Sequence, residues 1–485
     1  MPMLHSRRQF FASATAIAGL AALPATARAG SDRLKILYNR AAQEHFPDQN
    51  PVIVIPGILG TRLVDGASGE TVWGAFDGIS PNSSDKANVS RLAFPFHRQS
   101  LGPDLADLRP DAVLDRVRVR LLGVPFQLRQ YAQILSTLGA AGYRDETLHP
   151  KGLDYGPGHI SCFQFPYDWR RDNAETALAL KQFMDERRLV VADGYREYHG
   201  YDVAPESIRF DVVAHSMGAV MFRYFMRYGG QPLDTLGAGP TLDWAGAAYV
   251  DRAILVAPPN GGSGETMRLL LEGQDFGRPV APRYPPSVLG SFPSVYQLLP
   301  RPWSPAIEGV DGQRLFEAKT WIDRGWGIAD PDQAPVLERL LPEVSDPDRR
   351  RHLALDHLEV SLKRAQKFHT ALDSAQLAPI GFEPFLVAGD AVPTPERYRY
   401  DAQRKRLTVV SSAPGDGAVT RSSALLDHRT PSTWTPRIQS PLRFRSVLFT
   451  EQDHLGLTRT DLFSDNLLFW LLEEQRGENS VRYSI

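Results

Sequence analysis

Six short runs of apolar and β-branched residues recur along the chain, each bounded by Gly, Pro or polar residues. Their apolar character is nearly continuous, which is typical of strands buried on both faces of a sheet. Several stretches between them carry apolar residues three or four apart and predict amphipathic helices. The alternation predicts an α/β fold with a mostly parallel central sheet and helices on both faces. The predicted strands are residues 51–57, 162–169, 209–216, 252–259, 384–390 and 444–450, and the predicted helices are residues 127–143, 175–188, 219–228 and 460–475.

Two segments interrupt this alternation and predict large insertions. Residues 61–125 follow the first strand without a clear regular element, and residues 260–383 separate two strands by far more than a crossover requires. We expect the first to face the membrane or the substrate and the second to form a cap or lid; the alternative is surface structure without a role. The aromatic residues of these segments favour a lipid-facing or substrate-covering role. They are Trp73, Phe76, Phe94, Phe96, Trp303, Trp321 and Trp326.

The first 29 residues resemble a targeting segment. Arg7 and Arg8 precede an Ala-rich apolar run over residues 10–22, and small residues precede a cleavage point after Ala29. The pattern predicts a twin-arginine signal peptide, and therefore export to the periplasm or the medium. A retained membrane anchor is the alternative, although the apolar run is shorter than the ~20 residues that a bilayer requires. Residues 30–485 are expected to form the folded domain.

Composition narrows the classes of function. With 42% hydrophobic and 23% charged residues among 485, the chain can bury a globular core. A formal net charge of −2 without a cluster of Lys and Arg argues against nucleic acid as a partner. The single cysteine, Cys162, excludes an intrachain disulfide and a Cys-based zinc site. The absence of HExxH and glycine-rich phosphate-binding motifs predicts neither a metal nor another cofactor.

Ser216 is the candidate nucleophile. It stands in AHSMG, directly after a predicted buried strand and directly before a predicted helix, as in a nucleophile elbow. The sharp turn of an elbow requires small neighbours, which Ala214 and Gly218 provide. An ordinary serine that caps a helix is the alternative interpretation.

A serine hydroxyl needs a base, and the base needs an acid that fixes its tautomer. Among the histidines near the C-terminus, His454 follows the last predicted strand, whereas His428 lies between elements, so we favour His454. The acid has two candidates: Asp390 at a strand end, and Asp416 in a Gly-flanked turn. We favour Asp416, whose alternative role is to bond its own turn backbone.

Two backbone N–H groups are expected to stabilise the oxyanion. Met217 follows the nucleophile and supplies one of them. The second is expected from Ile58 or Leu59, in the tight turn PGILG after the first strand. Ordinary turn chemistry would also account for this Pro-Gly pair.

Eight segments, in order and at sensible spacing, resemble the lecithin:cholesterol acyltransferase (LCAT) and lysosomal phospholipase A2 family of α/β hydrolases. The match runs through most of residues 30–485, although residues 61–125 and 260–383 match poorly. The elbow also departs from the family in having Ala214 where Gly is usual. The matching segments are PVIVIPGILGTRL, YAQILSTLGAAGYRDETL, FQFPYDWRRD, AHSMG, LVAPPNGGS, PTPERYRYD, GDGAVTRSS and DHLGL.

The resemblance implies an α/β-hydrolase fold with cap or lid insertions. It implies Ser216 as nucleophile, Asp416 as acid and His454 as base, with Ile58 and Met217 as oxyanion donors. It favours Asp416 over the strand-end acid because the PTPERYRYD segment precedes the acid in this family.

The implied function is that of an exported serine acyl hydrolase or O-acyltransferase. Its substrate would be a lipid or phospholipid ester at a membrane or lipoprotein-like interface, and an acyl-serine would pass to water or to an alcohol such as a sterol. The alternatives are an esterase for a soluble ester and a lipid-binding protein with an idle triad.

Overall fold

The computed structural model describes eleven stretches of the chain. The predicted signal peptide, residues 1–29, lies outside them and stays a prediction. The described residues are 33–43, 49–74, 86–96, 107–114, 117–121, 124–128, 131–147, 159–233, 239–274, 283–430 and 433–476.

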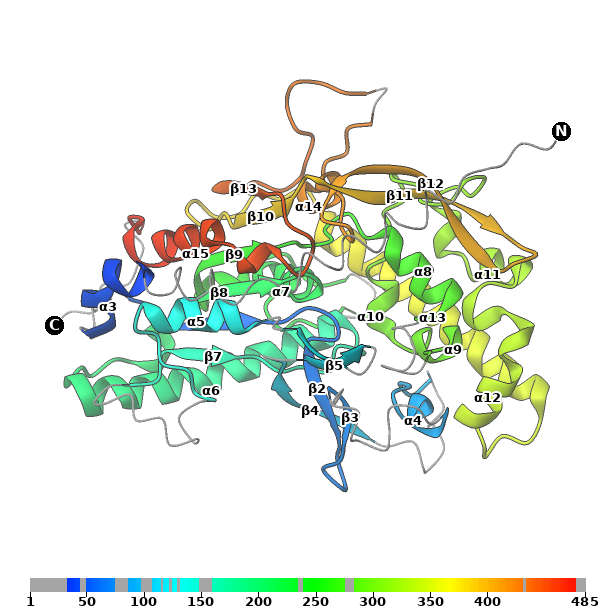
Figure 1. Ribbon diagram of the computed structural model, residues 1–485, viewed down its shortest axis with the longest axis horizontal. Helices are drawn as coiled ribbons and strands as arrows, with labels where there is room; N and C mark the ends of the chain where they lie inside the picture. The colour runs from blue at the N-terminus through cyan, green and yellow to red at the C-terminus, as the bar shows by residue number, and fades with distance from the viewer. Residues whose placement is uncertain are drawn as a thin grey trace.

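The centre of the molecule is a six-stranded parallel sheet (Figure 1). Five of the six strands fall within the predicted apolar runs, and β9 overlaps its run but begins two residues earlier. Four strands are buried at every position, because helices cover both faces of the sheet. The order β13-β10-β9-β8-β1-β7 confirms the predicted α/β class and is consistent with an α/β hydrolase. The strands are β1 (Val52–Ile55), β7 (Cys162–Gln164), β8 (Phe210–His215), β9 (Val250–Val256), β10 (Phe385–Gly389) and β13 (Ser446–Thr450).

Successive strand residues face two separate hydrophobic clusters. In β1, Ile53 and Ile55 join one cluster, while Val52 and Val54 join the other, as the period of two in a strand requires. The first cluster includes residues of α6 (Asn173–His199) and α7 (Met217–Tyr228). The second includes residues of α5 (Ala132–Ala140) and α15 (Asp461–Leu468). The sheet therefore lies between two helical layers.

The segment 61–125 contains short antiparallel strands that the sequence pattern missed. Its strands have mixed burial. In β4 only the first and last residues are buried and three consecutive residues are exposed, so no clean alternation of apolar and polar positions marks the strand. They form a three-stranded sheet of order β3-β2-β4, and β5 begins a separate hairpin with β6. The elements are β2 (Thr61–Asp65), β3 (Thr71–Trp73), α4 (Lys86–Arg91), β4 (Leu108–Val113), β5 (Val117–Leu121) and β6 (Val124–Leu128).

The segment 260–383 is largely helical, and a two-stranded hairpin of β11 (Val392–Asp401) and β12 (Arg406–Gly415) packs against its first helix (Figure 1). The boundaries of both insertions stay predictions. The helices are α8 (Gly264–Glu272), α9 (Pro286–Leu289), α10 (Pro293–Tyr296), α11 (Ala318–Arg324), α12 (Ala334–Leu340) and α13 (Pro347–Asp373), and α14 (Arg421–Leu425) follows the hairpin.

The expectation that the aromatic residues of the insertions face lipid or substrate is wrong for four of them. Trp73, Phe96, Trp321 and Trp326 are at most 4% exposed. The reason is that the insertions pack onto the core of the sheet, so these residues join its first hydrophobic cluster, where the last two indoles meet edge to face at 5.8 Å. Of the others, Phe94 and Trp303 are partly buried, and Phe76 lies outside the described residues.

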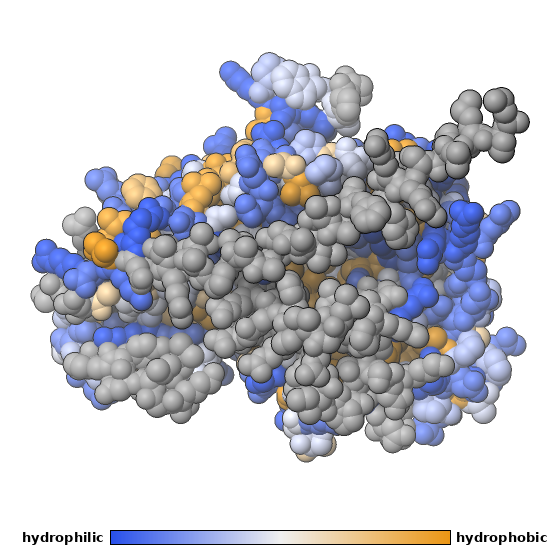
Figure 2. All heavy atoms as spheres, viewed as in Figure 1, coloured by the Kyte–Doolittle hydropathy of each residue, from blue (hydrophilic) through white to orange (hydrophobic). Residues whose placement is uncertain are grey.

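Apolar side chains do reach the surface elsewhere. On the face in Figure 2, described apolar residues gather mainly toward the end that carries α15 and β13. Leu462 and Phe469, in and just after α15, are about half exposed. Among the described helices, every one is too short or too polar to cross a bilayer.

The YDWR segment anchors the first insertion to the sheet. Trp169 is fully buried, and its indole N–H donates to the carbonyl of Thr61. Arg170 forms a buried ion pair with Asp168 at 2.8 Å and donates to the carbonyl of Leu92. The Arg170 guanidinium thus bonds both the Asp168 carboxylate and the backbone of the insertion. Because this guanidinium is buried, loss of the carboxylate would leave an unpaired charge in the interior, which is costly.

We expect Asp168→Asn to lower the free energy of unfolding by about 3–5 kcal/mol, because it leaves the buried Arg170 charge unpaired. Urea unfolding measures this loss. The matched control is Glu175→Gln, which removes the partner of Arg171 from a pair whose side chains are about half exposed, and should cost less than about 1 kcal/mol. Equal losses in the two variants would contradict the anchoring role.

Candidate active site

The turn between β8 and α7 holds Ser216 in a strained conformation. Its φ of 53° and ψ of −126° lie where residues with side chains are rarely found. A Cβ at Gly218 would lie 2.1 Å from the carbonyl oxygen of Pro56, so only glycine fits there. Ser216 occupies the N-cap position of α7 but makes no side-chain capping bond. The geometry therefore favours an elbow over an ordinary capping serine.

The structure brings the three predicted triad residues together from distant segments. His454 lies in the loop after β13, and its Nε2 is 2.9 Å from Ser216 Oγ. Its Nδ1 is 2.8 Å from Asp416 Oδ2. An ionised carboxylate only accepts, so Nδ1 carries the proton and Nε2 can accept the serine hydrogen. This is the hydrogen-bond order that a general base requires.

The buried Asp416 carboxylate divides its two oxygens between two tasks. Oδ1 accepts from the backbone N–H groups of Ala418 and Val419, and Oδ2 faces His454. Burial opposes ionisation, but the charge and hydrogen bond of His454 and the two N–H groups hold the pKa of Asp416 below its usual range. Asp416 therefore has both of the roles considered for it: it bonds the backbone of its own turn and it is the partner of His454. Asp390 directly follows β10, and its backbone N–H donates to the carbonyl of Thr450.

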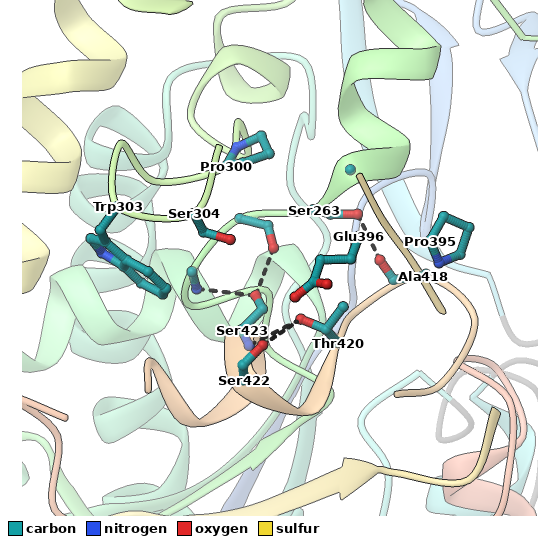
Figure 3. A pocket seen from close by; sticks show the side chains of 13 residues that line it. Ser263, Pro300, Trp303, Ser304, Pro395, Glu396, Ala418, Thr420, Ser422 and Ser423 are labelled. Carbon is teal, nitrogen blue, oxygen red and sulfur yellow. Dashed lines mark hydrogen bonds between the residues drawn. The ribbon is translucent and has the colours of Figure 1, made fainter. Parts of the chain in front are cut away.

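The segment after β9 supports the acid turn (Figure 3). Ser423 Oγ donates to the carbonyl of Gly262 and accepts from the N–H of Gly261. Ser263 Oγ donates to the carbonyl of Ala418. Gly262 has a φ of 88°, and a Cβ there would lie 2.3 Å from a backbone oxygen. The NGGS part of the resemblance thus has a structural role beside the acid.

A pocket lies beside the acid turn, with the Glu396 side chain among those lining it (Figure 3). None of its lining residues belongs to the triad. We therefore do not assign it as the substrate site.

The predicted oxyanion donors lie on either side of the elbow. Ile58 is in the turn after β1, and Met217 is the first residue of α7. In the described part of the chain, neither backbone N–H donates to another residue. The two segments are close, since a Cβ at Gly57 would be 2.8 Å from that of Ser216. The oxyanion role of Ile58, rather than its neighbour Leu59, stays a prediction.

Two buried residues that the sequence analysis did not single out connect these loops. His215 Nε2 is 3.2 Å from the carbonyl oxygen of His454, so Nε2 carries the proton. His215 Nδ1 then accepts from the hydroxyl of Tyr131, at 3.1 Å. The same hydroxyl oxygen accepts from the N–H of Gly57, at 2.7 Å. Both residues lie inside segments that resemble the family, but no local signal predicts a contact across 84 positions.

Burial, and then the neighbouring His454, lower the pKa of His215 to about 3 from an ordinary value of 6.5. The folded protein therefore holds this imidazole neutral, as its hydrogen bonds require. The unfolded chain takes up a proton below pH 6.5, so the associated stability is present above that pH and is lost as the pH falls toward 3.

We expect His215→Gln to flatten this pH dependence. Between pH 7 and pH 5 the free energy of unfolding of the unsubstituted protein should fall by about 2 kcal/mol more than that of the variant. Urea unfolding at the two pH values measures the difference. The matched control is His352→Gln, at an exposed position, which should keep the original slope. Parallel slopes for His215→Gln and the unsubstituted protein would show that His215 is not held neutral.

The parallel sheet makes this an α/β protein, and the turn that carries Ser216 and its contact with His454 are consistent with an α/β hydrolase. Residues 126–322 match the family model of lecithin:cholesterol acyltransferase. Lysosomal phospholipase A and acyltransferase from Bos taurus is 26% identical over 284 residues, which cover 56% of this chain and 53% of the bovine protein. The chain thus spans about half the length of this curated relative. The predicted resemblance is confirmed: residues 126–322 are similar to lecithin:cholesterol acyltransferase, and the chain is a distant homologue of the bovine protein.

A solved structure described as the Tle4-Tli4 complex contains a chain with a similar arrangement. The TM-score is 0.49 at 14% sequence identity, and the alignment covers 88% of this chain and 99% of that chain.

Proposed function

We propose that the chain is an exported serine-dependent acyl hydrolase or O-acyltransferase that acts on phospholipid or other lipid esters. The observation that carries the proposal is the hydrogen-bonded series from Ser216 through His454 to the buried Asp416. The similarity to the LCAT family model supports a lipid ester as substrate, because the bovine homologue is named as a phospholipase and acyltransferase.

In the first half of the reaction, Ser216 Oγ attacks the ester carbonyl carbon while His454 Nε2 takes the hydroxyl proton. The resulting oxyanion accepts hydrogen bonds from the N–H groups of Ile58 and Met217. Asp416 stabilises the imidazolium that has formed. The tetrahedral intermediate collapses when the bond to the alcohol oxygen breaks and His454 returns its proton to that oxygen. The products are an acyl-serine and a free alcohol, such as a lysophospholipid.

In the second half, His454 removes a proton from the acceptor, whose oxygen attacks the carbonyl carbon of the acyl-serine. The bond from that carbon to Ser216 Oγ then breaks, and His454 returns the proton to Oγ. Water yields a free fatty acid, and an alcohol such as a sterol yields a new ester. Ser216 is 7% exposed and the His454 side chain is 19% exposed, so the acceptor reaches a largely covered site. Where a bound alcohol excludes water from this covered site, acyl transfer to the alcohol is favoured over hydrolysis.

Ser216→Ala should remove ester cleavage, because no other group supplies the attacking oxygen, and should lower kcat by about 10⁴-fold or more. The assay uses phosphatidylcholine liposomes with and without cholesterol, followed by separation of fatty acid from sterol ester. A fluorophosphonate should label the unsubstituted protein and not the variant. Unchanged turnover in a folded Ser216→Ala variant would refute the proposal.

The two acids provide the control for this assignment. Asp416→Asn should lose several orders of magnitude in kcat, whereas Asp390→Asn should stay near the unsubstituted value. The reverse ranking would move the acid to Asp390. Strong activity on a short water-soluble ester without activity on liposomes would favour the soluble-ester alternative. A folded protein that neither turns over nor labels would favour an idle lipid-binding protein.

Export through the twin-arginine pathway is the part of the proposal that rests on sequence alone. The paired Arg7 and Arg8 and the small residues before Gly30 support it. Expression in a bacterium with this pathway should give a periplasmic or secreted chain that begins at Gly30, which intact-mass spectrometry would detect. A full-length chain retained in the cytoplasm would contradict export, and a full-length chain in the membrane would favour a retained anchor.

A further inference from the structure

A second pocket lies toward the sheet edge opposite the elbow. Pro384 and Leu442, which line it, precede the amino ends of β10 and β13. Ser216 instead follows the carboxyl end of β8, and all six strands are parallel. The empty space is about 470 Å³, counting the part open to solvent. None of the residues that line it belongs to the triad, so any ligand would bind away from the candidate active site.

Helix α7 contributes two buried cations to this pocket. Arg223 and Arg227 are 3% and 2% exposed. Arg223 donates to the side-chain oxygen of Asn260 and to the carbonyl of Leu372. Arg227 donates to the carbonyl of Ser374. Within the described part of the chain, all three acceptors are neutral.

The nearest acid does not balance these charges. Asp373 bonds a third guanidinium, that of Arg301, at 2.7 Å. Asp373 thus pairs directly with Arg301 only, and within the described part of the chain neither Arg223 nor Arg227 forms an ion pair. Burial lowers the pKa of Arg223 to about 9, and Asp373 offsets this only in part. A buried charge without a counter-ion is costly, so an anion would be favoured here.

Two buried donors beside these cations lack an acceptor. The Nε–H of Arg227 and the indole N–H of Trp244 have no hydrogen-bond partner among the described residues. The Arg227 guanidinium lies 5.2 Å from the centre of the Trp244 ring, so both groups line one wall. Arg443, exposed at the same pocket, forms no ion pair in the described part of the chain. Together they offer donors of the kind that bind carboxylate or phosphate oxygens.

A purely structural role accounts for part of this arrangement. Arg223, Arg227 and Tyr228 donate to the last carbonyls of α13 or to the carbonyl of the residue that follows it, and cations are favoured at a helix C-terminus. That role uses neither the Nε–H of Arg227 nor the charge of Arg443. It also leaves the indole N–H of Trp244 without a hydrogen-bond acceptor among the described residues.

The remaining walls are apolar. Met226, Leu255, Leu377 and Leu442 line the pocket together with prolines, and Leu377 is about half exposed. Apolar walls beside a few convergent polar groups are typical of sites for small amphiphilic ligands. We propose that this pocket binds an anionic amphiphile, with its carboxylate or phosphate head against Arg227 and Arg443 and its apolar chain against the leucines. The proposal does not depend on the function of Ser216.

The test measures binding by isothermal titration calorimetry to the full chain, with decanoate, decyl phosphate, decanol and inorganic phosphate as probes. Arg443→Gln should weaken the binding of decanoate or decyl phosphate by about tenfold or more, because it removes a charge at the head group. Binding of decanol should be weak and unaffected by the substitution. A preference between decanoate and decyl phosphate identifies the head group as carboxylate or phosphate.

The matched control is Arg437→Gln, an exposed arginine in the same segment that does not line the pocket. It should bind the anionic probes as tightly as the unsubstituted protein. Equal weakening by the two substitutions, absence of binding of both anionic amphiphiles, or full binding by Arg443→Gln would overturn the proposal. Tight binding of inorganic phosphate alone would overturn the apolar part of it. Arg227→Gln is not the primary variant, because Arg227 also bonds the chain at the end of α13.

Discussion

The turn at Ser216 is the constraint on which the rest of the candidate site depends. A serine at φ 53° is held only because the flanking strand and helix are buried and Gly218 lets the helix approach Pro56. The strain directs the hydroxyl away from its own helix and toward His454. The loops that carry the imidazole and the oxyanion donors must then come to the serine, and buried hydrogen bonds through His215 join them.

The sequence predicts the parts of the fold that a single local pattern marks. Each strand of the parallel sheet lies in a largely apolar run, because burial on both faces of the central strands favours apolar side chains. The segment around Ser216 is also recognisable, since strand, small residues and helix must follow one another there. The residues alone favour Asp416 but leave Asp390 open, and the family resemblance favours Asp416 more strongly. The structure places His454 against Asp416.

Other parts depend on contacts between distant positions. Trp321 and Trp326 look exposed in a segment of short helices, yet those helices bury both indoles against each other. The pair of Tyr131 and His215 is formed across a sheet connection and leaves no periodic pattern in the chain. The short strands of the first insertion are half buried and too irregular for alternation to mark them. Local sequence patterns therefore predict the central sheet and its helices better than they predict the two insertions that pack on them.

The position of β13 has a consequence for how the molecule responds to heat. It is the outermost strand of the sheet, paired on one side only, and four of its five residues are at least partly exposed. The loop that follows it carries His454. Fraying of an edge strand needs far less energy than opening the central strands. Moderate heating should therefore separate the His454 imidazole from Ser216 while β8 and the turn that follows it stay folded. The hydrogen bonds of the triad would then be lost at a lower temperature than the global fold.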